Sequence, residues 1–221
     1  MARPRFDDEG NEIFSGKVGV FPLVTQQPAL RRSRNREAGT LEVKPVTSVT
    51  REIIREFLLA KVIPKIWEVW PTDDSRSTIF IQQDNARTHV DPNDVEFQEV
   101  ASQNGFDIRL MCQPANSLDF NILDLGFFRA IQSMQEKKKT NNIAELIQAV
   151  EMSFAEYSSV HVNRVWITYQ LCMVETMKVQ GSNKYKIPRV NKARLEREGC
   201  LPKQITCDPV LVENVRSQLQ S

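Results

Sequence analysis

Apolar residues follow two kinds of pattern along the chain, short continuous runs and repeats every three or four positions. Two short runs, at 78–84 and 106–112, predict strands, and a polar turn follows each of them. Between them, Asp91 and Pro92 predict the cap and the first residue of a helix that stops at Gly105. This order of strands and helices predicts an α/β sheet with helical additions.

Apolar side chains spaced every four residues predict several further helices. The first begins at Ser48 or Thr50, and Pro64 should kink or split it, because proline lacks the backbone donor that a helix interior needs. The remaining helices are expected at about 121–134, from near Asn141 to Tyr157, at 160–178 and at 210–219.

The first 47 residues contain less regular patterns. Residues 5–24 predict a hairpin with a turn at 9–12 and a second strand at 17–21. Only residues 1–6 can pair with that second strand, which suggests that part of the sheet is missing from this sequence. Residues 25–47 show no period and predict an exposed loop.

Composition limits the classes of function. The chain has 221 residues, enough for one domain or two small ones, and an apolar fraction of 41% that is sufficient for a packed core. The formal net charge of +1 indicates no particular partner. It hides one basic stretch, 178–203, which carries eight Lys and Arg against two Glu.

Scarce residue types exclude several kinds of site. With 8 Gly, 2 His and 4 Cys, the sequence has neither a glycine-rich phosphate loop nor paired zinc-ligand spacing. The cysteines are expected to be reduced and buried. No apolar run approaches the roughly 18 residues of a membrane span, and the polar start is not a signal peptide. We therefore expect an intracellular chain whose chemistry, if any, depends on carboxylates.

Two aspartates are the candidates for that chemistry. Asp84 follows the strand at 78–84, and ligands of open α/β sheets bind beyond the carboxyl ends of strands. Asp124 lies in the first turn of the helix after the next strand, so both acids can reach one sheet edge. Alternatively, Asp84 belongs to a simple turn, Asp124 stabilises a helix dipole, and Asp119 caps that helix. Paired carboxylates can hold Mg²⁺ for phosphoryl transfer.

The residues around these acids resemble a known family. The catalytic domain of plant mariner-like transposases is similar to two segments here, IFIQQDNARTH at 79–89 and QPANSLDFNILDLGFF at 113–128. The 39 residues between Asp84 and Asp124 match the interval of the plant branch of that superfamily. The hairpin, the Arg-rich segment and residues 181–188 also look like the family, so the resemblance spans nearly the whole chain.

The resemblance implies a ribonuclease H-like mixed sheet flanked by helices and a site of three aspartates. In the family these bind two Mg²⁺ (or Mn²⁺) ions, cut DNA strands and join them to new DNA. Asp84 matches the second acid and Asp124 the third. The first acid belongs to a strand of the form Val-His-Ile-Asp-Glu-Lys-Trp, which does not occur in residues 1–221, and the acids at 7–9 are poor substitutes. The family's helix-turn-helix region is absent as well.

From this resemblance we expect residues 1–135 to be a partial catalytic domain and 136–221 a helical, basic extension packed on it. The missing first strand would lie mid-sheet, and its absence should leave two inner edges unpaired and the fold marginally stable. The expected function is that of an inactive, transposase-derived protein. The alternatives are a domesticated, non-catalytic module that binds nucleic acid and a gene-model fragment without function.

DNA is the expected partner, and a homodimer is compatible with the family. The candidate DNA-binding residues are Arg31, Arg32, Arg34 and Arg36 in the loop and Lys184, Lys186 and Arg189 in the basic stretch. The arginines also fit a nuclear localisation signal, which predicts a nuclear protein, although both sets fit plain solvated surfaces equally well. We expect His89 to be structural and the three tryptophans to lie in the core.

Overall fold

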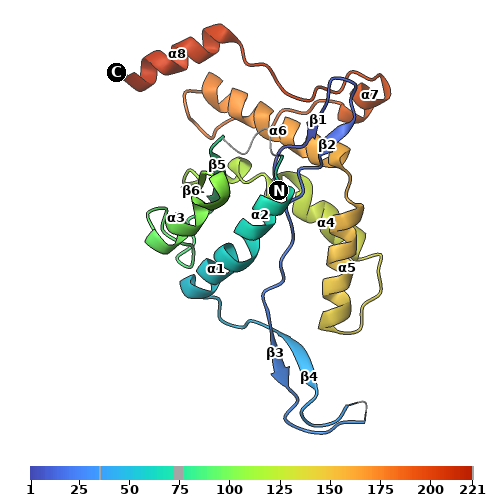
Figure 1. The fold of residues 1–221 in the computed structure, drawn as a ribbon. Helices are drawn as coiled ribbons and strands as arrows, with labels where there is room; N and C mark the ends of the chain where they lie inside the picture. Colours follow the sequence, from blue (N-terminus) through green and yellow to red (C-terminus); the bar gives the residue numbers. More distant parts are fainter. Residues whose placement is uncertain (35, 72–76, 221) are drawn as a thin grey trace.

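The computed structural model describes residues 1–34, 36–71 and 77–220 as a mixed α/β chain (Figure 1). Its strands form three two-stranded sheets in these ranges. They are the antiparallel pairs β1 (Arg5–Phe6) with β2 (Glu12–Phe14) and β3 (Val24–Pro28) with β4 (Leu41–Pro45), and the parallel pair β5 (Ile79–Gln83) with β6 (Ile108–Cys112). The expected single sheet is therefore not formed within the described residues.

Helices make up most of the remaining structure. They are α1 (Arg51–Phe57), α2 (Ile63–Val69), α3 (Val95–Ala101), α4 (Phe128–Gln135), α5 (Ile143–Glu156), α6 (Ser159–Lys178), α7 (Lys192–Arg197) and α8 (Pro209–Gln220). Short turns are η1 (Leu58–Val62), η3 (Gln103–Gly105), η4 (Leu118–Phe120) and η5 (Leu123–Phe127). In Figure 1 the β3–β4 hairpin projects from the body as an arm, and α8 extends from the opposite end.

The first hydrophobic core surrounds the β5–β6 pair. Residues from α1, η1, α2 and α3 pack with both strands, and the side chains of Ile63 and Phe97 are completely buried there. Both predicted strands are confirmed, with ends trimmed by one or two residues. The helix expected from Ser48 or Thr50 begins after the N-cap Thr50, and Pro64 does not end it. α1 passes through the π-helical turn η1 into α2 with right-handed helical angles at both junctions, and this wider turn stands directly before Pro64, which lacks a backbone donor.

The helix predicted to begin at Asp91 begins later. Asp94 is the N-cap of α3, and its Oδ1 accepts a hydrogen bond of 3.0 Å from Phe97 N. The Oδ1 atom of Asp91 instead accepts from Asn93 N at 2.8 Å, which closes a local turn. The prediction was wrong because both aspartates suit a cap, and only Asp94 is also bound by Arg55 from α1.

The N-terminal hairpin differs from its prediction. The turn closes at residues 7–11, where Asn11 N donates to Asp7 Oδ1 at 2.7 Å, so β2 occupies 12–14 and residues 17–21 form no strand. Gly16 then turns the chain with a φ of +78°, and a Cβ there would lie 2.4 Å from Ala2 O. A glycine is required at this close approach.

The loop predicted at 25–47 is also wrong, since these residues form the β3–β4 arm. Its five residue pairs run in regular antiparallel register from Val24 opposite Pro45 to Pro28 opposite Leu41. Most of β3 is exposed, so the arm carries no alternating apolar pattern from which a strand could be predicted.

The second hydrophobic core joins the two expected domains. Phe127 and Ile131 from η5 and α4 pack with Tyr157 and Val162 of the extension. One hydrophobic core therefore spans the domain boundary expected at residue 135. The caps of α5 and α6 are Asn142 and Ser158. All four cysteines are free, as expected, but only Cys172 is buried. Among the described helices, none combines the length and the apolar character needed to cross a bilayer.

Candidate functional site

Asp84 lies immediately after β5, at its carboxyl end. Its side chain is 57% exposed, and its Oδ1 accepts a hydrogen bond of 2.8 Å from Ala86 N. His89 Nδ1 lies 2.7 Å from Asp84 O and 3.0 Å from Asp84 Oδ1, so Nδ1 must carry the proton that these acceptors share. His89 thus orients the turn after β5, in agreement with its expected structural role.

Asp124 is exposed in η5, and its backbone N donates to Asn121 O at 3.0 Å. The segment that precedes it contacts β5, because Gln82 Nε2 donates to Phe120 O. The next loop is joined to the strand end as well, where Asn85 Nδ2 donates to Gln113 O at 2.9 Å. The structure therefore brings together the two segments that carry Asp84 and Asp124, although neither carboxylate contacts the other segment through a described hydrogen bond.

The Asp84 and Asp124 carboxylates could supply two of the ligands of a single hard cation, but not a complete set. Mg²⁺ binds to one or two carboxylates and fills its other positions with water, and both side chains are exposed to solvent. In residues 1–34, 36–71 and 77–220, no group of three or more His, Cys, Asp or Glu side chains is arranged to hold a metal. Asp7 accepts from Asn11 in the β1–β2 turn and is not a third ligand. The described residues do not fit a two-metal centre.

A cavity of about 470 Å³ separates the N-terminal segment from β5. Residues 1–3 and Arg5 line one side, residues 78–82 line another, and Trp70 and Trp166 close it from α2 and α6. The indole Nε1 atoms of both tryptophans are buried without a hydrogen-bond partner. The cavity therefore lies beside the strand that leads to Asp84 and is partly open to solvent, since the exposed side chains of Phe80 and Met111 also line it.

The edge of β5 that faces away from β6 has no strand beside it among the described residues. Ile79 N donates to Asp107 O, and Gln83 O accepts from Gln113 N, both at 2.8 Å. Backbone groups alternate in a parallel pair, so those of Phe80 and Gln82 point to the opposite edge. Both residues line the cavity, which leaves room for pairing with a further strand.

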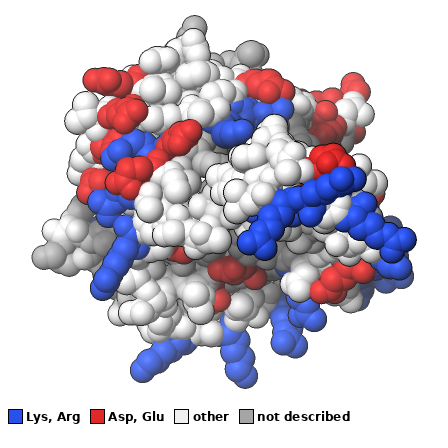
Figure 2. Space-filling model, turned by 90° about the horizontal axis from the view of Figure 1, so that it is seen from below, with Lys and Arg blue, Asp and Glu red and all other residues white. Residues whose placement is uncertain are grey.

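The arginines of the β3–β4 arm differ in their contacts. Arg32 Nε lies 3.2 Å from Glu37 Oε1, and Arg36 is half-buried in an ion pair with Glu42. Arg31 and Arg34 are exposed at the tip. Figure 2 shows that Lys and Arg side chains on this face stand in separate groups among acidic ones rather than in one continuous patch.

Lys184, Lys186 and Arg189 are exposed in the segment between α6 and α7, and none of the described ion pairs involves them. Lys192, which follows them, is different, because its Nζ binds Thr168 Oγ1 and burial lowers its pKa. The segment between α6 and α7 therefore presents Lys184, Lys186 and Arg189 to solvent, and Lys192 attaches its end to α6.

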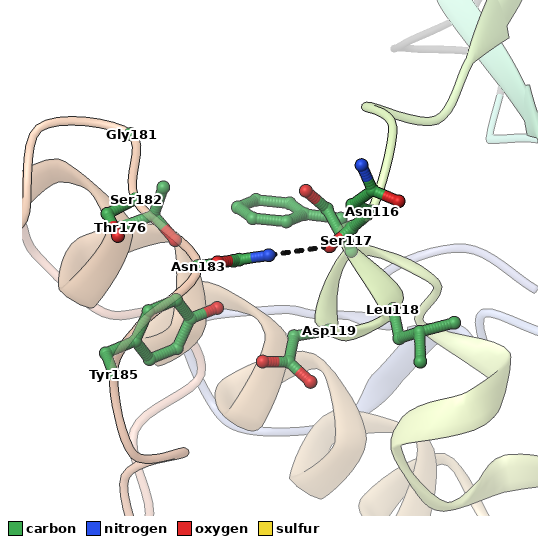
Figure 3. A pocket seen from close by; sticks show the side chains of 10 residues that line it. Asn116, Ser117, Leu118, Asp119, Thr176, Gly181, Ser182, Asn183 and Tyr185 are labelled. Carbon is green, nitrogen blue, oxygen red and sulfur yellow. Dashed lines mark hydrogen bonds between the residues drawn. The ribbon is translucent and has the colours of Figure 1, made fainter.

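A small polar pocket of about 190 Å³ was not predicted from the sequence (Figure 3). It lies between residues 116–120 and the turn after α6, where Asn183 Nδ2 donates to Asn116 O at 3.1 Å. Asp119, the alternative helix cap, points into this pocket rather than capping a helix with its side chain. Unusual backbone marks both walls, because Asn116 and Gln180 have φ values of 56° and 54°.

Comparison with known proteins adds no relative: no family model, no curated protein and no solved structure matches this chain.

Proposed function

We propose that this chain is a DNA-binding protein derived from a mariner-type transposase, with a ribonuclease H-like topology and an incomplete catalytic centre. The observation that carries the proposal is the placement of the two motif aspartates. Asp84 stands at the carboxyl end of β5, and the segment leading to Asp124 is hydrogen-bonded to that strand through Gln82. Their separation by 39 residues is the one that the family motif requires.

The gap beside β5 supports the topology. In the family fold the first strand lies between the N-terminal hairpin and the strand that carries the second acid. Here a cavity of about 470 Å³ lies between residues 1–5 and β5, and an edge of β5 faces it. We propose that this gap corresponds to the first strand, which would also bear the first catalytic aspartate.

The incomplete acid set is the reason to propose a loss of catalysis. When bound, paired Mg²⁺ ions stabilise the attacking and leaving oxygens of a phosphoryl transfer. The Asp84 and Asp124 carboxylates would hold one ion at most, because no third acid accompanies them in the part of the chain that the structure describes. Cleavage and strand transfer then belong to the ancestral enzyme.

DNA binding would depend mainly on the exposed cations of the segment between α6 and α7. Lys184, Lys186 and Arg189 can approach a phosphate backbone without first breaking an ion pair. The exposed Arg31 and Arg34 would add contacts from the arm, and they also support a nuclear location for the protein. A homodimer belongs to the proposal through the family resemblance alone.

A second candidate function is a domesticated module that binds nucleic acid without any role for the acids. It is favoured because none of the described ion pairs joins Lys184, Lys186 or Arg189 to an acid, so binding through 184–189 needs neither carboxylate. Loss of the acids leaves binding unchanged under this alternative, whereas a residual metal site would make binding respond to Mg²⁺.

The experiment is a titration of a 30-base-pair duplex between 50 and 200 mM salt. We expect the variant K184Q/K186Q/R189Q to bind about tenfold or more weakly, with a log–log salt slope lower by about 2–3, near 0.9 for each lost phosphate contact. The matched control is K61Q/K137Q/K139Q, which removes three exposed cations elsewhere. An equal loss in both variants, or binding that ignores salt, would contradict the proposal.

A further inference from the structure

The polar pocket between 116–120 and the turn after α6 has a definite chemical character. Asp119 is its one ionised side chain, and it faces the space between Asn183 and Tyr185 (Figure 3). The two walls are 67 residues apart in the sequence and are joined by the Asn183–Asn116 hydrogen bond. The pocket therefore forms only when these two distant segments are brought together by the fold.

The Asp119 carboxylate is the one charged hydrogen-bond acceptor of this pocket, and the Tyr185 hydroxyl is hydrogen-bonded to it. The Asp119 carboxylate can only accept, and Asn183 has already used an N–H on Asn116 O, which leaves its Oδ1 to accept. Ser182 Oγ accepts from Lys184 N at 3.2 Å, so its hydroxyl hydrogen remains available to donate. A complementary ligand has two adjacent N–H donors beside an acceptor.

Aromatic rings supply the apolar part of the lining. Phe120 is held by an edge contact with Tyr169, with ring centroids 6.0 Å apart. Tyr185 is half-buried on the other wall, and burial raises the pKa of its hydroxyl. Flat heterocycles stack on such rings, so a planar ligand is favoured.

The surrounding charge decides between two kinds of planar donor. A guanidinium group would satisfy Asp119, but Lys184 and Lys186 flank Tyr185 of the pocket wall in the sequence, and both are exposed cations that disfavour a positively charged ligand. A nucleotide carries its donors on the base and its negative charge on the phosphate. Its base can enter the pocket while the phosphate stays beside the exposed cations.

We propose that this pocket binds an unpaired guanine base of DNA, with Asp119 accepting from N1–H and N2–H and with Ser182 donating to the base. The choice of guanine follows from its two adjacent donors. Adenine and cytosine place a ring acceptor next to their amino group, and Asp119 would repel it. The site rests on the proposed DNA-binding function and extends it from backbone contacts to recognition of a single base.

The test is a titration of the whole ¹⁵N-labelled chain with dGMP, dAMP, dCMP and dTMP, each as the free mononucleotide. We expect dGMP to shift the signals of Ser182, Asn183 and Tyr185 and to bind at least tenfold more tightly than the other three. Asp119→Asn should remove that preference, because an amide offers a donor where a carboxylate oxygen accepted. The matched control is Asp8→Asn, the same charge change at an exposed turn.

Equal binding of all four nucleotides, or an unchanged preference in Asp119→Asn, would overturn the proposal. If Asp119→Asn fails to fold, the ranking of nucleotides on the unchanged chain still decides. The outcome is separate from that of the duplex titration. Salt-dependent duplex binding without a dGMP preference refutes only the pocket, and a dGMP preference without duplex binding refutes only the backbone contacts.

Discussion

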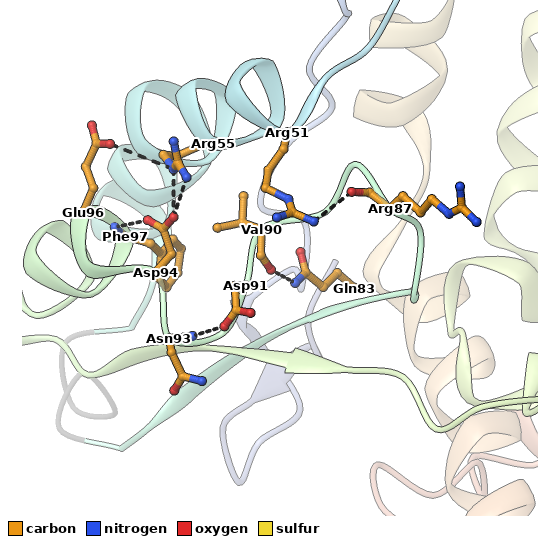
Figure 4. A network of polar contacts seen from close by, with 10 residues as sticks. All are labelled: Arg51, Arg55, Gln83, Arg87, Val90, Asp91, Asn93, Asp94, Glu96 and Phe97. Atoms are coloured by element: carbon orange, nitrogen blue, oxygen red, sulfur yellow. Dashed lines mark hydrogen bonds and ion pairs between the residues drawn. The ribbon is translucent and has the colours of Figure 1, made fainter.

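Asp84 and Asp94 lie ten residues apart between β5 and α3, and their carboxyl groups have different surroundings. Asp94 is 11% exposed and caps α3, and its Oδ2 accepts hydrogen bonds of 2.9 and 2.6 Å from Arg55 Nε and Nη2 (Figure 4). Asp84 is 57% exposed, and its partners among the described residues, Ala86 and His89, belong to its own turn. One carboxylate holds two helices together, and the other remains available to a ligand.

The surroundings of Asp94 shift the pKa of its carboxyl group. Burial of its carboxyl group opposes ionisation, but the hydrogen bond from Phe97 N and the pairing with Arg55 outweigh it and keep the pKa below the usual range. The folded state therefore prefers the ionised Asp94. A carboxylate at a functional edge gains nothing from such partners, because they would compete with a metal or a substrate.

The largest effect expected from this comparison is on stability. Asp94→Ala removes the N-cap of α3 at a cost of about 1–2 kcal/mol and in addition leaves Arg55 without its main partner. The matched variant Asp84→Ala should change the free energy of unfolding by less than about 0.5 kcal/mol, as exposed substitutions usually do. Urea denaturation of both variants measures this, and equal destabilisation would show that the two acids have equivalent roles.

The pH dependence of Asp94 is the next largest effect. Because its folded pKa is lower than the unfolded value of about 3.9, its ionisation stabilises the protein fully above that value. The contribution disappears as the pH falls through the lower folded pKa. Asp94→Asn keeps a good cap and loses the charge, so its stability deficit should shrink below about pH 4. A deficit that is constant down to pH 2 would show that the charge of Asp94 contributes nothing.

The smallest effect concerns metal at Asp84. Mn²⁺ should broaden amide signals near 83–86 and 123–125 in the unchanged chain, less so in Asp84→Asn, and should leave the signals around Asp94 sharp. Supercoiled plasmid with Mg²⁺ should stay uncut, because two carboxylates do not make a two-metal centre. Nicking that disappears in Asp84→Asn would overturn the proposed loss of catalysis.

The sequence identified the elements whose signals are local. The strand of Ile79, the helix start at Thr50 and the cap near Asn141 follow from propensity and capping, which depend on neighbouring residues only. The register of the first hairpin was not predictable, because the turn at Asp7 competes with the one expected at 9–12. The β3–β4 arm was missed because most of β3 is exposed, and the partly buried centre of β4 is Glu42, Val43 and Lys44, which gives no apolar period.

The candidate site also has parts that the sequence predicts and parts that it does not. The apolar run at 78–84 predicted that Asp84 stands at the end of a strand, and the structure agrees. The pocket at Asp119 required contact between Asn116 and Asn183, which no local pattern encodes. The sequence also did not distinguish which basic residues are free to bind a ligand. Arg36 forms an ion pair with Glu42 and Lys192 a hydrogen bond with Thr168, whereas Lys184 is exposed.

The root of the β3–β4 arm has a consequence for how this chain can vary. Val46 N donates to Leu23 O at 2.9 Å where the arm joins the body. This hydrogen bond holds the two ends of the arm together at its base. Residues added or removed at the tip would change the reach of the arm while leaving Leu23 and Val46 in place. Length can therefore be inserted there, for a reporter tag or in the course of evolution, without disturbing either hydrophobic core.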